Sequence, residues 1–212
     1  MGQKEQLLVY LRELLKWNQR INLTSLRREE EIIAKHFLGS LAFLRAFEPA
    51  PGLEVADLGA GAGFPGLPIK IYRPEICLTL IEASQKKAAF LKHIGRILGL
   101  EGVRYEAQRS EALIREGNYL GSFDLILCRA VGKVGKVIPF SLPLLKVGGS
   151  LVVQKGEEVE EEGQAAARAL ADYQARMEKV IPVELPPKGT RFNLLVVKKN
   201  GVGTASLHSL LQ

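Results

Sequence analysis

The sequence predicts an α/β protein with a mostly parallel sheet of seven strands, an antiparallel terminal strand and an N-terminal helical cap. Three observations support this fold class. Helical apolar periodicity runs over residues 3–48, and short apolar runs then alternate with amphipathic segments over residues 53–176. Two β-rich segments follow with no room for a helix between them. Alternating strands and helices are typical of a parallel sheet with right-handed crossovers.

Residues 1–50 are expected to form the helical cap. Apolar residues recur at spacings of three and four from Leu7 onward, which is the period of an amphipathic helix. We expect two helices, separated at residues 21–24 by the sequence Ile-Asn-Leu-Thr. The Pro-Ala-Pro-Gly sequence at residues 49–52 then ends the cap, because proline and glycine interrupt helices.

The core domain is expected to span residues 51–200. The predicted strands before its last two segments are residues 53–58, 77–81, 103–106, 123–128 and 150–154, and the predicted helices are residues 65–72, 84–98, 110–115, 136–145 and 157–176. The last two segments, Lys179–Leu185 and Phe192–Lys198, are joined by a short Pro- and Gly-containing stretch and should therefore pair antiparallel. Residues 201–212 are rich in small residues and are expected to be a flexible tail.

The composition indicates an ordinary globular protein. Its 212 residues are 47% hydrophobic and 25% charged, which is enough to bury a full core as one domain. The N-terminus lacks the apolar stretch of a signal peptide, and no run approaches the roughly 20 apolar residues of a membrane span. We therefore expect a cytoplasmic protein, and we expect it to be a monomer. Cys77 and Cys128 lack zinc-ligand spacing, so both are interpreted as reduced thiols and no metal site is predicted.

The charge balance favours a polyanionic partner. The formal net charge is +6 and the isoelectric point is near 9.3, and cationic surfaces attract nucleic acids. The basic residues are scattered in small groups, several of which fall on loops and helix starts that a doubly wound sheet brings to one edge. The alternative is that many of them line solvated helix faces.

The most informative segment is a glycine-rich loop directly after the first predicted strand. Gly61, Gly63 and Gly66 satisfy the G-x-G-x-x-G spacing of a dinucleotide site. A second register, D-x-G-x-G-x-G from Asp57 through Gly59, resembles motif I of the class I methyltransferases, which bind S-adenosylmethionine. A pyrophosphate has no use for a carboxylate ahead of the loop, whereas a cationic aminoacyl ligand can pair with one. We therefore favour S-adenosylmethionine.

Two further segments favour an adenosine ligand. Glu82 ends the second predicted strand about 20 residues after the loop, where a carboxylate can accept hydrogen bonds from both ribose hydroxyls. The alternative for Glu82 is an acidic residue before a helix that Ser84 caps. Ser110 and Glu111 follow the third predicted strand, where a loop reaches the adenine end of such a cleft. A Ser-Glu pair is also common at helix starts.

The loop after the fourth predicted strand lacks the motifs of two other methylation chemistries. Exocyclic amines usually require an Asp/Asn-Pro-Pro-aromatic motif and cytosine C5 a Pro-Cys nucleophile, whereas Arg-Ala-Val follows Cys128 here. Arg129 is the candidate in this loop, because a guanidinium can pair with a carboxylate, a phosphate or the edge of guanine. His36 and His93 lie in predicted helical stripes and are poor candidates for a general base. Guanine N7 has a free lone pair and needs no base.

The chain closely resembles the bacterial small-subunit ribosomal RNA guanine-N7 methyltransferase family, RsmG, also called glucose-inhibited division protein B. The resemblance runs over most of the chain. The segments that carry it are Trp17–Thr24, His36–Leu41, Asp57–Pro68, Arg109–Glu111, Arg129–Val131 and Lys155–Gly156. One departure is Gly39, where the family often has Asp.

The resemblance implies a Rossmann-like class I fold and transfer of a methyl group from S-adenosylmethionine to N7 of a guanine in 16S rRNA, in a loop near the decoding region. The substrate would be the rRNA or a small-subunit assembly intermediate. It also implies that Gly59 and Phe64 contact the cofactor, that Ser110 and Glu111 hold adenine, and that Arg129 lies beside the cofactor or the incoming base. With the residues inferred from the pattern itself, the predicted cofactor site is Asp57, Gly59, Gly61, Gly63, Phe64, Glu82, Ser110, Glu111 and Arg129.

Two other functions stay open at this point. A nicotinamide-dependent oxidoreductase could use the dinucleotide register of the glycine loop. A non-catalytic RNA-binding protein could retain the same fold. Cofactor preference distinguishes the first from a methyltransferase, and methyl transfer distinguishes the second.

Overall fold

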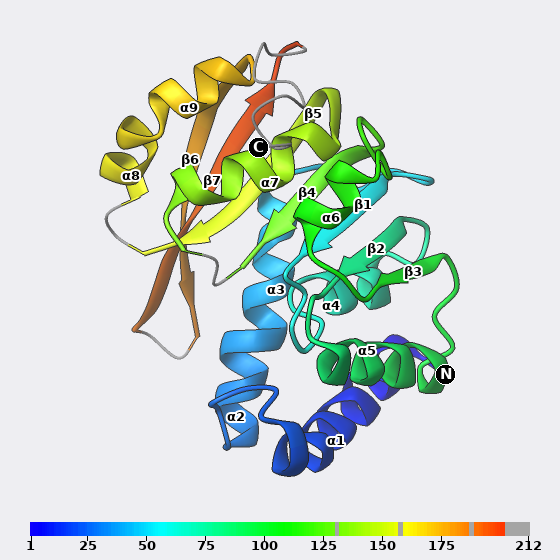
Figure 1. Ribbon diagram of the computed structural model, residues 1–212. Coiled ribbons are helices and arrows are strands. Elements are labelled where there is room, and N and C mark those ends of the chain that lie inside the picture. Colours follow the sequence, from blue (N-terminus) through cyan, green and yellow to red (C-terminus); the bar gives the residue numbers. More distant parts are fainter. Residues whose placement is uncertain (130–131, 157–158, 187–188, 202–212) are drawn as a thin grey trace.

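The computed structural model describes residues 1–129, 132–156, 159–186 and 189–201 (Figure 1). Three predicted features therefore fall partly or wholly outside the described residues: the first two residues of the helix predicted over 157–176, the turn at Pro187 and Lys188, and the tail beyond Gly201. Ala130 and Val131, which belong to the motif at Arg129, also lie outside them. Across the described ranges, none of the helices combines the length and the apolar character that crossing a bilayer requires.

A seven-stranded sheet forms the centre of the molecule. Its strands are β1 (Glu54–Leu58), β2 (Cys77–Ile81), β3 (Val103–Glu106), β4 (Phe123–Cys128), β5 (Leu145–Lys155), β6 (Ala175–Leu185) and β7 (Thr190–Lys199). They lie in the order β3-β2-β1-β4-β5-β7-β6, with β1 to β5 parallel and β7 antiparallel to both β5 and β6. The predicted fold class is confirmed, including the antiparallel end of the sheet. The order reverses at β1 and β4, and ligands of open α/β sheets bind at such a reversal.

Helices cover both faces of the sheet. The helices that cover it are α1 (Gln3–Ile21), α4 (Gly66–Tyr72), α5 (Gln85–Ile97), α6 (Ser110–Arg115), α7 (Val134–Ser141), α8 (Val159–Ala165) and α9 (Ala167–Asp172). One apolar core joins α1, α4 and α5 to one face, and a second core joins α6 to α9 to the other. In Figure 1, α6 and α7 cross the front of the sheet, and α8 and α9 lie beside β6.

The helical cap breaks where the sequence predicts. Helix α1 ends at Ile21, and Asn22 follows in the left-handed conformation with φ 48°. The second helical stretch is less regular than its periodicity suggests. It consists of α2 (Glu29–Glu31), a π-helix η1 (Ile32–Leu38), α3 (Gly39–Leu41) and a 3₁₀-helix η2 (Ala42–Arg45). A π-helical turn inside a longer helix widens the backbone and is frequent at functional sites.

Two predicted boundaries differ from the structure. The helix predicted over residues 136–145 ends at Ser141, a 3₁₀-turn η3 (Leu142–Leu144) follows, and β5 begins at Leu145 rather than residue 150. The helix predicted over residues 157–176 is divided into α8 and α9, and β6 starts at Ala175. Short apolar stretches do not distinguish helix from strand. Here pairing with the neighbouring strands decides, since Leu145 pairs with Phe123 in β4.

Candidate functional site

The glycine loop leaves β1 at the point where the strand order reverses. Gly59, Gly61 and Gly63 all have positive φ angles, of 72°, 60° and 93°. The N–H of Gly59 donates to the carbonyl oxygen of Ile81 at 2.9 Å, which holds the loop against the end of β2. A β-carbon at Gly59 would meet no atom within 4 Å, and one at Gly61 would meet nothing closer than 3.8 Å. The backbone of Gly59 and Gly61 is therefore bare, in the sense that a ligand could approach it without meeting another side chain.

Gly63, in contrast, is enclosed by neighbouring side chains. A β-carbon there would lie 2.4 Å from Leu67 Cδ1 and 2.5 Å from the Tyr10 hydroxyl. Gly66, which completes the dinucleotide register, is also enclosed, because its β-carbon would lie 2.8 Å from Asp57 Oδ2. These two glycines allow α1, α4 and β1 to pack closely. They do not present bare backbone to a ligand.

Two hollows adjoin the loop, and Gly59 lines both of them. The first, of about 280 Å³, lies toward β3, and its lining includes Leu58, Gly59, Ala83, Gln108, Ser110, Glu111, Val137 and Phe140. The second, of about 250 Å³, lies toward the N-terminal helices, and its lining includes Thr24, His36, Gly59, Gly61, Phe64, Glu82, Lys87 and Arg129. The structure thus brings seven of the nine predicted site residues to one continuous region. The other two, Asp57 and Gly63, line neither hollow.

Asp57 lies beneath the loop with no exposed surface. Its Oδ2 accepts a hydrogen bond of 2.8 Å from the N–H of Gly66, at the start of α4. Its Oδ1 is buried and has no hydrogen-bond partner. Burial raises the pKa of this carboxyl to about 7, although the Gly66 hydrogen bond and the positive charge of Arg129 oppose the shift. A buried oxygen without a partner is costly, so Asp57 has an acceptor available for a donor.

Glu82 connects the second hollow to the loop. Its carboxylate accepts two backbone hydrogen bonds, one to Oε2 from the N–H of Gly61 at 2.8 Å and one to Oε1 from the N–H of Ser84 at 2.7 Å. Only 9% of the residue is exposed. Each oxygen retains a lone pair, so the same carboxylate can accept further hydrogen bonds from hydroxyl groups in the hollow. Ser84 also caps α5, as predicted, by accepting from the N–H of Lys87.

Ser110 and Glu111 begin α6 at the edge of the first hollow. Ser110 is 7% exposed, and its hydroxyl donates to Glu111 Oε2 at 3.2 Å. The wall opposite them is apolar, with Leu58, Val137 and Phe140. Apolar walls with polar groups at one edge are the usual lining of a small-molecule pocket, and they suit a flat ring.

Arg129 extends from the end of β4 to the π-helix. Its Nη2 donates to the carbonyl oxygen of Lys35 at 2.7 Å, and its Nη1 donates more weakly to that of His36 at 3.5 Å. Burial lowers the pKa of this guanidinium to about 10, so it stays charged at neutral pH. Arg129 thereby joins the sheet to the N-terminal helices across the second hollow.

Sequence reasoning missed the contribution of His36 and Thr24 to the second hollow. The His36 ring stacks on Phe64 with centroids 4.6 Å apart, and its Nε2 lies 2.7 Å from the Thr24 hydroxyl oxygen. Burial, together with the positive charges of Arg129 and Lys35, lowers the pKa of His36 to about 4. The sequence does not indicate this role for His36, because apolar periodicity does not show which residue of a helix contacts a distant loop.

The described residues offer little metal or thiolate chemistry in this region. They contain no group of three His, Cys, Asp or Glu side chains that could hold a metal ion. Cys128 is fully buried, and burial raises the pKa of its thiol well above the usual range, which disfavours a thiolate nucleophile. The arrangement is suited to binding and orienting two ligands side by side, one on each side of Gly59.

The comparisons with known proteins agree with this geometry. A family model described as GidB, rRNA small subunit methyltransferase G, matches residues 3–187. A protein of Caldanaerobacter subterraneus named ribosomal RNA small subunit methyltransferase G is 41% identical over 88% of this chain and 77% of its own length. A protein of Roseiflexus castenholzii with the same name is 39% identical over 92% and 83%.

Solved structures share the fold at lower sequence identity. A SAM-dependent methyltransferase from Aquifex aeolicus superposes with a TM-score of 0.57 at 18% identity, covering 79% of this chain and 92% of that protein. At this identity the likeness concerns the fold alone. That protein is named as SAM-dependent.

Proposed function

Because this chain belongs to the rRNA small subunit methyltransferase G family, we propose that it transfers a methyl group from S-adenosylmethionine to N7 of a guanine in 16S rRNA. S-adenosylmethionine supplies the methyl group on a cationic sulfur. The N7 lone pair forms the new N–C bond as the S–C bond breaks, so the sulfur becomes a neutral thioether and the product is a 7-methylguanine cation. No proton leaves the base.

The observation that carries the cofactor assignment is the bare backbone of Gly59 and Gly61. It lies between the enclosed carboxyl of Asp57 and the carboxylate of Glu82, which lines the second hollow. In the proposed arrangement, adenine occupies the first hollow beside Ser110 and Glu111. Glu82 accepts hydrogen bonds from the ribose hydroxyls. The aminoacyl end lies along the bare backbone of Gly59 and Gly61, where its ammonium is near the buried Asp57 carboxyl and its positive charge favours the carboxylate form.

The remaining predicted site residues support this arrangement in different ways. Phe64 and Arg129 line the second hollow, where the methyl group would face the incoming base. Gly63 acts through packing, since it allows α1 and α4 to approach the loop. The dinucleotide register is less suitable, because the N–H of Gly66 already donates to Asp57 and is not free for a phosphate.

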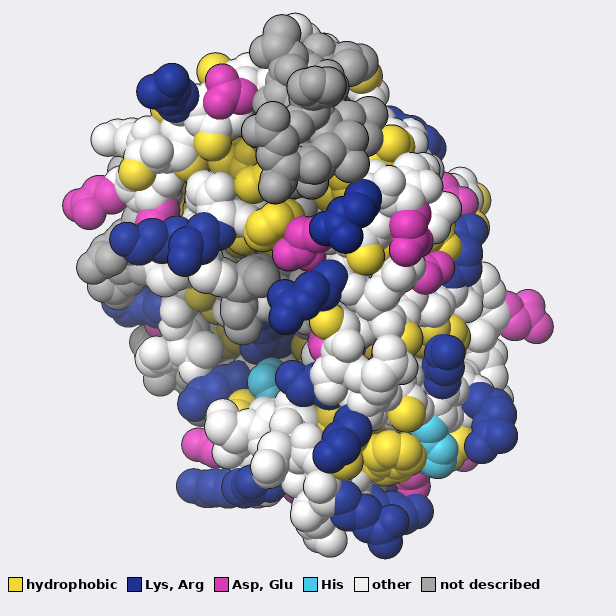
Figure 2. Space-filling view, in the orientation of Figure 1, with side chains coloured by type: hydrophobic (Ala, Val, Ile, Leu, Met, Phe, Trp, Pro, Cys, Tyr) yellow, Lys and Arg dark blue, Asp and Glu magenta, His cyan; other side chains and the backbone are white. Residues whose placement is uncertain are grey.

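Ring-nitrogen methylation is compatible with the side chains around the second hollow. N7 attack requires alignment and exclusion of water, and no group needs to remove a proton. His36 is neutral at physiological pH, and Arg129 is a fixed cation bound to backbone carbonyls. The rRNA itself would be attracted by the basic residues around this face, where Figure 2 shows Lys and Arg side chains bordering the central hollow. The monomeric state and the cytoplasmic location stay predictions from the sequence.

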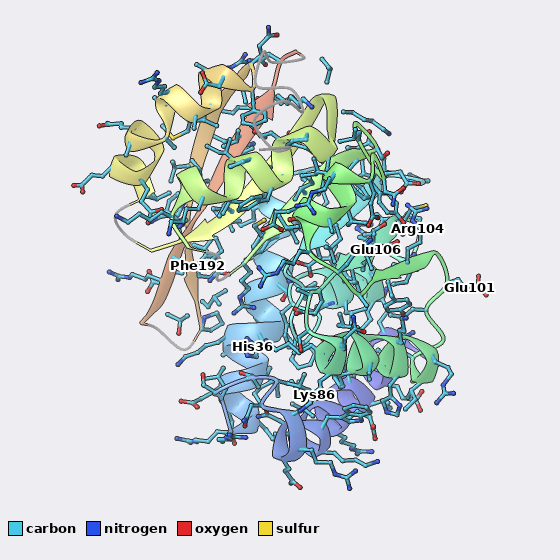
Figure 3. The ribbon with its side chains drawn as sticks, viewed as in Figure 1. His36, Lys86, Glu101, Arg104, Glu106 and Phe192 are labelled. Carbon is cyan, nitrogen blue, oxygen red and sulfur yellow. The ribbon has the colours of Figure 1, made fainter. Side chains whose placement is uncertain are left out.

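Labelling the RNA with the purified protein tests the proposed function. Wild-type protein is incubated with methyl-labelled S-adenosylmethionine and either naked 16S rRNA or small ribosomal subunits lacking this modification. Nuclease digestion and mass spectrometry should then identify 7-methylguanosine at one position. The Glu82→Ala variant should lose most of the label, whereas Glu101→Ala, which changes an exposed carboxylate at the far edge of Figure 3, should retain it. Label on another base, or on protein only, overturns the proposal.

A further inference from the structure

Three rings form a stack that runs from the protein core to the second hollow. Tyr10 and Phe64 stack with centroids 5.3 Å apart and an interplanar angle of 9°, and Phe64 and His36 stack at 4.6 Å and 22°. Tyr10 has no exposed surface and Phe64 is 7% exposed, whereas His36 is half-buried and lines the hollow. The stack therefore ends at the cleft with the imidazole of His36.

One face of the His36 ring has no aromatic neighbour. Phe64 covers the other face, and among the described residues no second ring stacks on His36. Figure 3 labels His36 near the middle of this face of the molecule, and Figure 2 shows Lys and Arg side chains around the same region. Lys87 and Arg129 line the hollow with His36. A flat aromatic surface beside cations is the usual composition of a site for a single nucleotide of RNA.

Besides the stack on Phe64, one hydrogen bond orients the ring, and its partner Thr24 is itself fixed in place. The Thr24 hydroxyl oxygen accepts from the N–H of Leu26 at 3.2 Å and lies 2.7 Å from His36 Nε2, to which it can donate its proton. Thr24 is itself fixed, because its backbone N–H donates to the side chain of Asn18 at 2.9 Å. A ring whose orientation is set before binding loses little entropy when a base stacks on it.

The charge state of His36 suits such a surface. Burial and the cations Arg129 and Lys35 lower its pKa to about 4, so the ring is neutral at physiological pH. A neutral ring does not repel a cationic sulfur or a base that becomes cationic when it is methylated. Arg129 supplies positive charge nearby, but its guanidinium is directed to the carbonyl oxygens of Lys35 and His36.

We propose that the face of the His36 ring opposite Phe64 is the platform on which the methyl-accepting purine stacks. The inference rests on the proposed function and names the residue that holds the base. In this arrangement the purine becomes the fourth ring of the Tyr10–Phe64–His36 stack, next to the bare backbone of the glycine loop. His36 acts through its ring face, and its nitrogens take no part in proton transfer.

Three substitutions at His36 separate stacking from hydrogen bonding. His36→Ala removes the ring, His36→Gln retains a polar group that can reach Thr24, and His36→Phe retains only the ring. The kcat and KM for labelling 16S rRNA are measured for each, together with the affinity for S-adenosylhomocysteine by calorimetry. Loss of one stacked base contact should lower kcat/KM about 10- to 100-fold for Ala and Gln. His36→Phe should stay within about threefold of wild type, and cofactor affinity should change by less than about twofold in all three.

His93→Gln is the matched control, because His93 also contacts an aromatic ring and a polar partner, but on α5 facing Glu13 and Trp17, away from the hollows. Its kcat/KM should equal that of wild type. Equal activity of wild type and His36→Ala overturns the platform, and so does a His36→Phe variant as inactive as His36→Ala. If wild type labels no RNA at all, the proposed function has failed, and that result is visible before any variant is compared.

Discussion

The position of Gly39 in α3 faces the guanidinium of Arg129: a β-carbon built there lies 3.8 Å from Nη2 and 3.9 Å from Nη1. The nearest atom to that β-carbon is Leu185 Cδ1 at 3.6 Å, an ordinary van der Waals distance, so the β-carbon itself fits without a clash. Arg129 has already lost much of its hydration, and its hydrogen bonds within the described residues go to backbone carbonyls. A carboxylate at residue 39 would therefore neutralise a cation that is buried in any case.

Gly39→Asp should stabilise the protein. The new carboxylate gains charge-assisted hydrogen bonds from Arg129, which we expect to raise the free energy of unfolding by about 1–2 kcal/mol over Gly39→Ala. Gly39→Ala is the proper reference because it includes the gain from removing a glycine inside a helix, about 1 kcal/mol. Urea denaturation of both variants measures the difference. A Gly39→Asp protein no more stable than Gly39→Ala would show that desolvating the carboxylate outweighs the pairing.

Glu82→Ala should weaken cofactor binding by about 1–3 kcal/mol, the usual cost of leaving buried donors without a partner. The structure adds that Gly61 and Ser84 also lose their acceptor, so the loop is affected together with the ribose contact. Glu82→Gln should be nearly as weak, because its amide group presents N–H to one of those two N–H donors. Calorimetry with S-adenosylhomocysteine checks both variants against Glu101→Ala. Unchanged affinity in Glu82→Ala would remove Glu82 from the proposed site.

The buried Asp57 carboxyl should make the stability of the free protein pH-dependent. Its pKa is about 7 in the folded chain and near 3.8 when solvated, so folding favours the protonated form. The contribution is complete below about pH 4 and is lost as the pH rises through 7, a change on the order of 4 kcal/mol. Asp57→Asn has no such proton. The stability of wild type relative to Asp57→Asn should fall between pH 5 and pH 8, as measured by urea denaturation at each pH.

The same carboxyl should link cofactor binding to pH. If the ligand ammonium lies near the buried Asp57 carboxyl as proposed, its positive charge favours the ionised carboxylate, and affinity for S-adenosylhomocysteine should rise from pH 6 to pH 8. The charges that face Asp57 are Arg129, which favours ionisation, and Glu82, which opposes it. Calorimetry in buffers of different ionisation enthalpy should detect release of a proton on binding at pH 6. Binding without proton release there, with equal affinity at both pH values, would contradict the placement of the ammonium near Asp57.

Gly59→Ala and Gly63→Ala should fail in different ways. A β-carbon at Gly63 collides with Leu67 and Tyr10 at a φ of 93°, so this variant should lose about 2–4 kcal/mol of folding stability. A β-carbon at Gly59 meets only the hollows, so Gly59→Ala should lose about 1–2 kcal/mol from its positive φ. Its affinity for S-adenosylhomocysteine should fall by at least about tenfold, which is 1.4 kcal/mol.

Gly99→Ala provides the reference for the Gly59 comparison. Gly99 has a similar φ of 62°, has no neighbour within 4 Å and lies in the turn after α5, away from the hollows. It should lose the same stability as Gly59→Ala while retaining cofactor affinity. Equal cofactor affinity in Gly59→Ala and Gly99→Ala would show that the loop backbone does not approach the ligand.

Much of the fold could be predicted because it depends on local patterns. The apolar runs of β1, β2 and β4 are buried strands, and the chain between β6 and β7 is too short for a crossover helix, so the two strands pair antiparallel. The boundaries that were wrong are those that pairing decides. Arg176 to Glu178 are mostly polar and exposed, so their sequence does not indicate a strand, yet they belong to β6, where Arg176 and Met177 pair with β7. The start of β5 likewise follows from its pairing with β4.

The sequence by itself determined the class of the sheet and the positions of the loop glycines, Glu82, Ser110, Glu111 and Arg129, because short-range spacing and strand ends carry that information. Only the tertiary structure decided what each residue faces. It enclosed Asp57 and Gly63 beneath the loop while Gly59 and Gly61 stayed bare. It also brought His36 onto Phe64, across 28 positions of the chain, to end a stack of rings at the cleft. Such contacts depend on how helices pack against a sheet, and the spacing of residues along the sequence does not specify that packing.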